Sequence, residues 1–94
     1  AVVYEHIRVS PGLLQTGGEH MMAGSGVLRL HSDFYGADEA LSDYAPARDD
    51  WRATLIVAGG SRREAWHKRC EVMADIRRTF ALGRFLESEP TAPF

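Results

Sequence analysis

The sequence has one cysteine, Cys70, no apolar run of 18 residues and a formal net charge of only −2 over 94 residues. A single cysteine rules out an intrachain disulfide and favours a reducing compartment, so we expect a cytoplasmic protein. The lack of a long apolar run or a signal peptide predicts no membrane partner. Dedicated nucleic-acid binders are usually strongly basic, so the sequence also predicts no nucleic-acid partner.

The remaining composition is that of one small globular domain, with 45% apolar and 26% charged residues. Charge is unevenly placed: residues 1–50 hold eight acids and three bases, and residues 51–94 hold five acids and eight bases. The basic second half could face an anion. The simpler interpretation is the solvated outer face of a helix.

Two segments have the β-branched and aromatic residues of buried strands. Val2–Val9 alternates, with Glu5 on the same side as three apolar residues, and Trp51–Ala58 is the best core candidate. Residues 10–26 are rich in glycine and contain Pro11, which predicts a poorly structured loop or a poorly formed hairpin.

A further strand is predicted over Val27–Ser32. We expect Leu28 and Leu30 to face inward. Arg29 and His31 should then face outward or into a cleft, because side chains alternate along a strand.

A short helix is predicted over Ala37–Tyr44. Asp38 and Glu39 would lie in its first turn, where the helix dipole favours acids. Pro46 follows and would prevent continuation.

A long helix is predicted from about Arg62 to Leu82. Ser61 is its expected N-cap, Glu64 completes a capping box, and Gly83 is the expected residue after its C-terminal cap. The expected buried stripe is Trp66, Cys70, Met73, Ile76 and Phe80. Cys70 is therefore predicted to be buried and unreactive.

Together these elements predict an α+β fold. Three to four mostly antiparallel strands form a sheet, and the long C-terminal helix and the short helix cover one face. We expect a single domain over residues 1–86, with a poorly structured loop at 10–26, and a C-terminal tail over residues 87–94.

The glycine turn is the first candidate site for chemistry. Gly59 and Gly60 permit positive φ and close approach, and Ser61 and Arg62 open a helix whose N–H groups could bind an anion. The turn lacks the lysine of a P-loop and the spacing of a dinucleotide fingerprint, and the capping box uses some of the donors. A purely structural turn is the alternative.

The second candidate is on the strand that follows the loop. His31 and Asp33 lie two residues apart, so one strand face could carry both for acid–base chemistry. Glu19 and His20 could join them at a metal, but no spacing predicts a catalytic ligand set, so we expect no metal site.

The stretch "GVLRLHSDFYG", followed by "RDD" and "TLIVAGGSRREA", resembles the C-terminal lobe of biotin carboxylases and related ATP-grasp carboxylate–amine ligases. The matching positions are Gly26, Val27, Tyr35, Gly36, Asp49, Val57, Gly59, Ser61, Arg62 or Arg63, Glu64 and Ala65. The family carries a lysine where this chain has Thr54. Its arginine follows Gly-Val directly, whereas Arg29 stands one residue later.

The resemblance implies a substrate-side or scaffolding lobe of a larger ligase, present as a fragment or subunit and not catalytic alone. Its partner would be the rest of the enzyme, and ATP and Mg²⁺ would be bound there and not by this chain. Arg29, His31 and Asp33 would then point toward the shared cleft. The residues leave two alternatives open: a free-standing α+β interaction module that pairs with a second copy of itself, and a small enzyme using His31 and Asp33.

Overall fold

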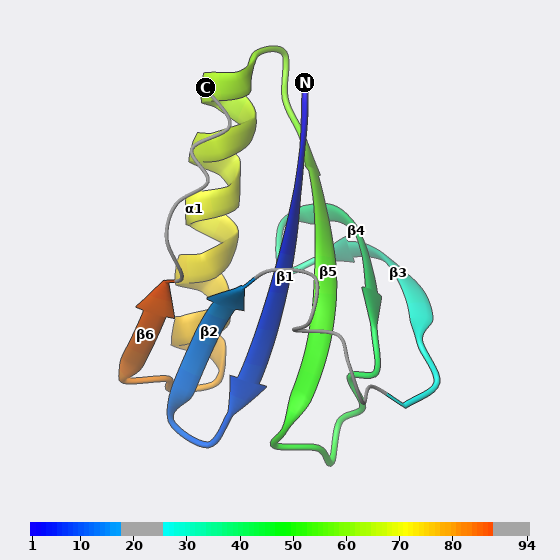
Figure 1. The fold of residues 1–94 in the computed structure, drawn as a ribbon, viewed down its shortest axis with the longest axis vertical. Coiled ribbons are helices and arrows are strands. Elements are labelled where there is room, and N and C mark those ends of the chain that lie inside the picture. The colour runs from blue at the N-terminus through cyan, green and yellow to red at the C-terminus, as the bar shows by residue number, and fades with distance from the viewer. Residues whose placement is uncertain (18–25, 88–94) are drawn as a thin grey trace.

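The computed structural model describes residues 1–17 and 26–87, which form one helix and a six-stranded mixed sheet (Figure 1). The strand order is β3-β4-β5-β1-β2-β6, and every neighbouring pair is antiparallel except β2–β6. The elements are β1 (Val2–Ser10), β2 (Leu13–Gly17), β3 (Arg29–Phe34), β4 (Ala37–Ser42), β5 (Trp51–Ala58), α1 (Arg62–Thr79) and β6 (Arg84–Glu87). The α+β class is confirmed, but the sheet has more than the three to four strands expected.

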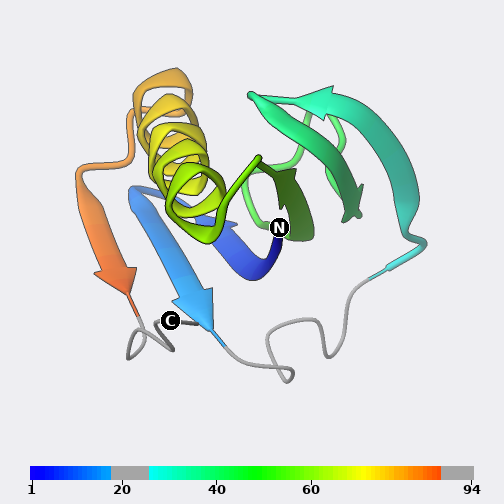
Figure 2. The same cartoon turned by 90° about the horizontal axis from the view of Figure 1, so that it is seen from above.

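The centre of the sheet is the antiparallel pair of β1 and β5, which runs from Val2 opposite Ala58 to Val9 opposite Trp51. Alternate residues of β5 and of the second half of β1 are buried. Helix α1 lies over one face of this pair, as Figure 2 shows from above. The largest fully buried side chains from these three elements are Ile7, Trp51, Leu55, Val57, Val72 and Ile76. Both central strands were predicted, because each is long and strongly patterned.

The expected loop at residues 10–26 begins with regular structure. Pro11 and Gly12 connect β1 to β2, and Ser10 pairs with Leu13 directly across this turn. Gly12 has a φ of 74°, as required of a glycine after proline in a type II turn. The hairpin alternative is therefore the right one for residues 10–17, and residues 18–25 lie outside the described part of the chain.

The short helix expected over Ala37–Tyr44 is wrong, because this segment forms strand β4. Tyr35 and Gly36 alone connect β3 to β4, with φ values of 52° and 100°. Two successive positive φ angles make the type I′ geometry of a tight hairpin. Pairing with β3 and β5 on both sides then outweighs the preference of Asp38 and Glu39 for a first helical turn.

The side-chain directions expected for β3 are reversed. His31 lies opposite Ala40, which is buried on the face toward α1. Leu30 lies opposite Leu41 on the other face, and both are exposed. The alternation of side chains between the two faces of β3 was predicted correctly. The sequence of this edge strand does not indicate which of the two sets of residues faces α1.

Helix α1 begins as predicted and ends early. Leu82 N–H bonds to the carbonyl of Arg77, and Ala81 N–H bonds to that of Arg78, which is the bonding pattern of a Schellman motif. Ala81, with a φ of 53°, is the left-handed residue of this motif. Gly83 was expected in that role, and the helix therefore stops at Thr79 and not at Leu82.

A strand that the sequence analysis did not predict follows the helix. Residues Arg84–Glu87 form β6 and pair in parallel with β2. Helix α1 carries the chain from the central strand β5 to this edge of the sheet, as a crossover to a parallel strand requires. Glu87, expected in the tail, is the last residue of this strand.

Candidate functional site

The glycine turn between β5 and α1 is built by close packing. A side chain on Gly59 would place its Cβ 2.5 Å from the backbone nitrogen of Ala65, so no larger residue fits without a backbone shift. Neither Gly59 nor Gly60 has a positive φ. The space beside the helix start, and not an unusual backbone conformation, therefore explains the glycine at position 59.

The polar groups of the turn are largely satisfied within it. Glu64 N–H donates to Ser61 Oγ at 3.1 Å, which confirms the predicted N-cap. Gly60 N–H donates to Glu64 Oε2 at 2.9 Å, so this carboxylate accepts from the residue before the cap. These donors are no longer available to an anion.

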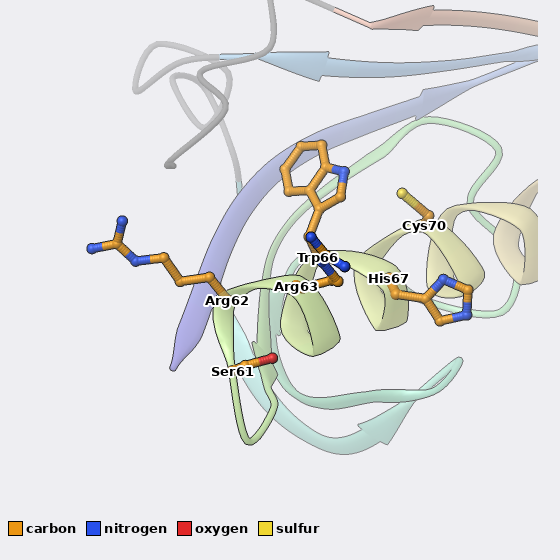
Figure 3. A pocket seen from close by; sticks show the side chains of 6 residues that line it. All are labelled: Ser61, Arg62, Arg63, Trp66, His67 and Cys70. Atoms are coloured by element: carbon orange, nitrogen blue, oxygen red, sulfur yellow. The ribbon is translucent and has the colours of Figure 1, made fainter.

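A hollow of about 690 Å³ lies beside the helix start, and its described lining is Ser61, Arg62, Arg63, Trp66, His67 and Cys70. All six residues come from the turn and the first half of α1. Figure 3 shows Arg62 extending away from Trp66 and Cys70, so the side chains do not converge on one point. Arg62 and Ser61 are the only members of the predicted site that line it.

The strand part of the predicted site lies elsewhere. Arg29 is paired with Ser42, and Ser42 is paired with Ala53 on β5. Ala53 precedes Gly59 by six residues, which is about 20 Å along a strand. The fold therefore does not bring Arg29 together with the glycine turn.

His31 and Asp33 are not linked by a hydrogen bond or ion pair in the described structure. The His31 ring centroid is 5.1 Å from that of Phe34, and its Nε2 is buried without a hydrogen-bond partner. Asp33 is exposed and has a φ of 53°. Within residues 1–17 and 26–87 no group of three or more His, Cys, Asp and Glu could hold a metal; Glu19 and His20 lie outside this part.

Aromatic rings fill the space between the β3–β4 hairpin and the C-terminal end of α1. Phe34, Tyr44 and Trp51 pack edge to face with one another, at centroid distances of 5.1 to 5.9 Å. Burial, helped by the hydrogen bond to Tyr44, raises the pKa of Tyr35 to about 12. These contacts make the cluster a structural core.

The clearest polar centre is one that the sequence analysis missed. Arg69 of α1 is 2% exposed, and its guanidinium bonds to Glu5 of β1 at 2.6 and 2.7 Å and pairs with Glu87 of β6. The guanidinium also lies 4.5 Å from the centroid of the Trp66 ring, within cation–π range. Burial raises the pKa of Glu5, and the attraction of Arg69 opposes this shift.

This centre holds three elements together, since it joins α1, the central strand and the last strand. The signal for it in the sequence was Glu5, an acid on the inward side of β1, which needs a cation from the covering layer. Helical spacing places Arg69 four residues after Ala65, on the buried face.

Cys70 is exposed, so its expected burial is wrong. The buried face of α1 consists of Ala65, Arg69, Val72, Met73 and Ile76. Because the buried face includes the charged Arg69, it differs from the purely apolar stripe that was expected through Trp66 and Cys70.

Asp38 links β4 to the end of β5 and to α1. Its carboxylate accepts Ala58 N–H at 2.8 Å and the Lys68 ammonium at 3.0 Å. The Ala58 N–H and Lys68 together lower the pKa of Asp38. The acid that was expected to start a short helix instead anchors α1 to β4 and β5.

The outer edge of the sheet carries an unusual group of exposed apolar side chains. Seven large apolar residues are exposed in the described part of the chain, and four of them lie on β3 or directly beside it. These four, here called the β3-edge group, are Val27 (84%), Leu28 (41%), Leu30 (60%) and Leu41 (39%). Apolar surface concentrated in this way is typical of an interaction site.

No protein-family model, curated protein or solved structure matches this chain. Over the residues that the structure describes, no helix combines the length and apolarity of a membrane-crossing segment.

Proposed function

We propose that this protein is an α+β interaction module that assembles with a second copy of itself through the β3 edge and has no catalytic role of its own. The observation that carries the proposal is the β3-edge group, which puts most of the exposed large apolar side chains of the described structure at one border of the sheet.

Strand β3 also lacks two of the features that usually protect a sheet edge. Natural edges are blunted by lysine, proline, a bulge or a covering element. The segment "VLRLHS" contains neither lysine nor proline. Its apolar side chains and its outward backbone groups together suit the addition of another strand.

Light scattering on a size-exclusion column tests the proposal. We expect the wild-type protein to run as a dimer and Leu30→Lys to run as a monomer, because a lysine there would be desolvated in the interface. Leu86→Lys is the matched control, since Leu86 is also an exposed leucine (47%) on an edge strand, but on β6. It should remain a dimer.

Two results would contradict the proposal. One is a wild-type protein that stays monomeric up to millimolar concentration. The other is an equal response of Leu30→Lys and Leu86→Lys, which would mean that the β3 edge has no special part in assembly.

The ligase-lobe hypothesis makes a different prediction, and the hollow beside Arg62 and Arg63 is the observation that favours it. ATP bound there should raise the melting temperature, because a ligand that binds only the folded state stabilises it. We expect no saturable rise, since Ser61 and Glu64 already occupy donors of the turn. A rise of several degrees that is lost in Arg62→Ala/Arg63→Ala would favour the ligase lobe.

A further inference from the structure

The free side of β3 offers backbone groups as well as apolar side chains. In the described sheet β3 is a terminal strand, bonded to β4 on one side only. In Figure 2 it lies at the border of the sheet farthest from β6. Half of its N–H and C=O groups therefore point away from the sheet, and a strand added there would bond to them.

Two charges of opposite sign stand at the two ends of this strand. Arg29 and Asp33 are both exposed, and neither makes an ion pair within residues 1–17 and 26–87. Some other charged residues of the described structure do make ion pairs, as Arg8 does with Asp50 and Lys68 with Asp38.

The charges of Arg29 and Asp33 favour one register for pairing β3 with a second copy of β3. In a two-fold symmetric antiparallel pair, one residue faces its own copy, and residues equally spaced on either side of it face each other. A pair centred on Arg29 places two guanidinium groups opposite each other. A pair centred on Leu30 places Arg29 opposite His31 and leaves Asp33 without a charged partner. A pair centred on His31 places Arg29 opposite Asp33 at both ends.

We infer that two copies of the protein pair β3 with β3 in antiparallel orientation about His31, with an Arg29–Asp33 ion pair at each end of the paired segment. This inference rests on the proposed function and specifies its interface. Directly opposed residues of opposite charge on one sheet face attract each other, whereas like charges repel.

The same register is consistent with the rest of the edge. Leu30 of each copy faces Ser32 of the other on the sheet face opposite α1, where Leu41 of its own hairpin lies beside it. The φ of 53° at Asp33 turns the backbone out of the extended conformation. Regular strand pairing therefore ends before Asp33, the carboxylate of Asp33 meets the long Arg29 side chain of the other copy just beyond it, and the two sheets become one.

Charge exchange tests this register. We expect Arg29→Asp and Asp33→Arg each to weaken dimerisation by about tenfold or more, because each change puts like charges opposite each other at both ends of the pair. The double variant Arg29→Asp/Asp33→Arg should regain most of the wild-type affinity, since it exchanges the two members of each ion pair. Sedimentation equilibrium over a dilution series measures all three constants.

Arg63→Asp is the matched control, because it makes the same change at an exposed arginine of α1. It should dimerise as the wild-type protein does. A urea denaturation curve for each variant shows that the monomer is folded.

The outcomes separate the inference from the proposed function. If the wild-type protein is monomeric, the proposed function fails and the inference fails with it. If the wild-type protein dimerises and Leu30→Lys does not, but the double charge variant shows no rescue, the β3 interface stands and the register about His31 is wrong.

Discussion

The two borders of the sheet differ in what they bury: a charged group is buried near β6, whereas apolar side chains are exposed near β3. Near β6, the Arg69 guanidinium is buried and forms ion pairs with two carboxylates of its own chain. Near β3, leucine and valine side chains lie in water. A buried charge must be paired to be tolerated, and this chain supplies the partners. No part of the described structure covers the exposed apolar residues of β3. We therefore assign assembly to the β3 border.

The largest effect should come from removing the buried cation. Arg69→Leu leaves Glu5 and Glu87 without their counter-charge, and we expect a loss of about 3–5 kcal/mol in the free energy of unfolding. Arg63→Leu, at an exposed position of the same helix, should change it by about 0.5 kcal/mol or less. Urea denaturation compares the two. Similar midpoints would show that the Arg69 centre contributes no more than a surface charge.

A smaller loss is expected at the turn that starts α1. Gly59→Ala brings a Cβ against the backbone of Ala65, and overpacking of this kind costs about 1–3 kcal/mol. Gly83→Ala is the control, because nothing lies within 4 Å of the added carbon. Thermal melts of the two variants give the difference. If Gly59→Ala and Gly83→Ala have the same melting temperature, close packing does not explain the glycine at position 59.

The Arg69 centre should also respond to pH. Because the pKa of Glu5 is raised in the folded protein, the folded state holds its proton at a pH where the unfolded chain has released it. The stability from this group is complete below its ordinary pKa of 4.5 and is lost as pH rises through the folded pKa. The free energy of unfolding of wild type relative to Glu5→Gln should therefore be higher at pH 4.5 than at pH 7. The opposite slope would mean that pairing with Arg69 outweighs burial.

The smallest effect on folding is expected at the other border. Leu30→Lys removes an exposed side chain, so the free energy of unfolding of the monomer should change by about 0.5 kcal/mol or less. Urea denaturation below the dimer dissociation constant measures it. A loss of more than 2 kcal/mol in the free energy of unfolding would mean that Leu30 stabilises the monomer. The two borders would then not differ in the way described above.

The sequence was sufficient to predict those parts of the fold that depend on strong local patterns. These are β1, β5, the start of α1 and its cap at Ser61. It missed β4 because the tight Tyr35–Gly36 turn has no asparagine or aspartate to mark it, and Asp38 and Glu39 resembled a helix start. It missed β6 because four residues in a parallel pair have little pattern of their own.

The site was less predictable than the fold. Nothing next to Arg69 in the sequence indicates its burial, because its partner Glu5 lies 64 positions away in the chain and its partner Glu87 lies in the last strand. Which side of β3 faces outward depends on its neighbours in the sheet, and alternation alone does not determine it. The assignment of Leu30 and His31 therefore required the three-dimensional structure.

The strand order also has a consequence for folding kinetics. Two units can form from local contacts: the β1–β2 hairpin, and the meander of β3, β4 and β5. They join only when β1 meets β5, and residues such as Glu5 and Leu55 that pair there are 50 positions apart. Contacts of such high sequence separation slow folding, because chain entropy is lost before these contacts form. Docking of β1 on β5 should therefore be the late, rate-limiting event, and until it happens β5 exposes a second unpaired edge beside that of β3.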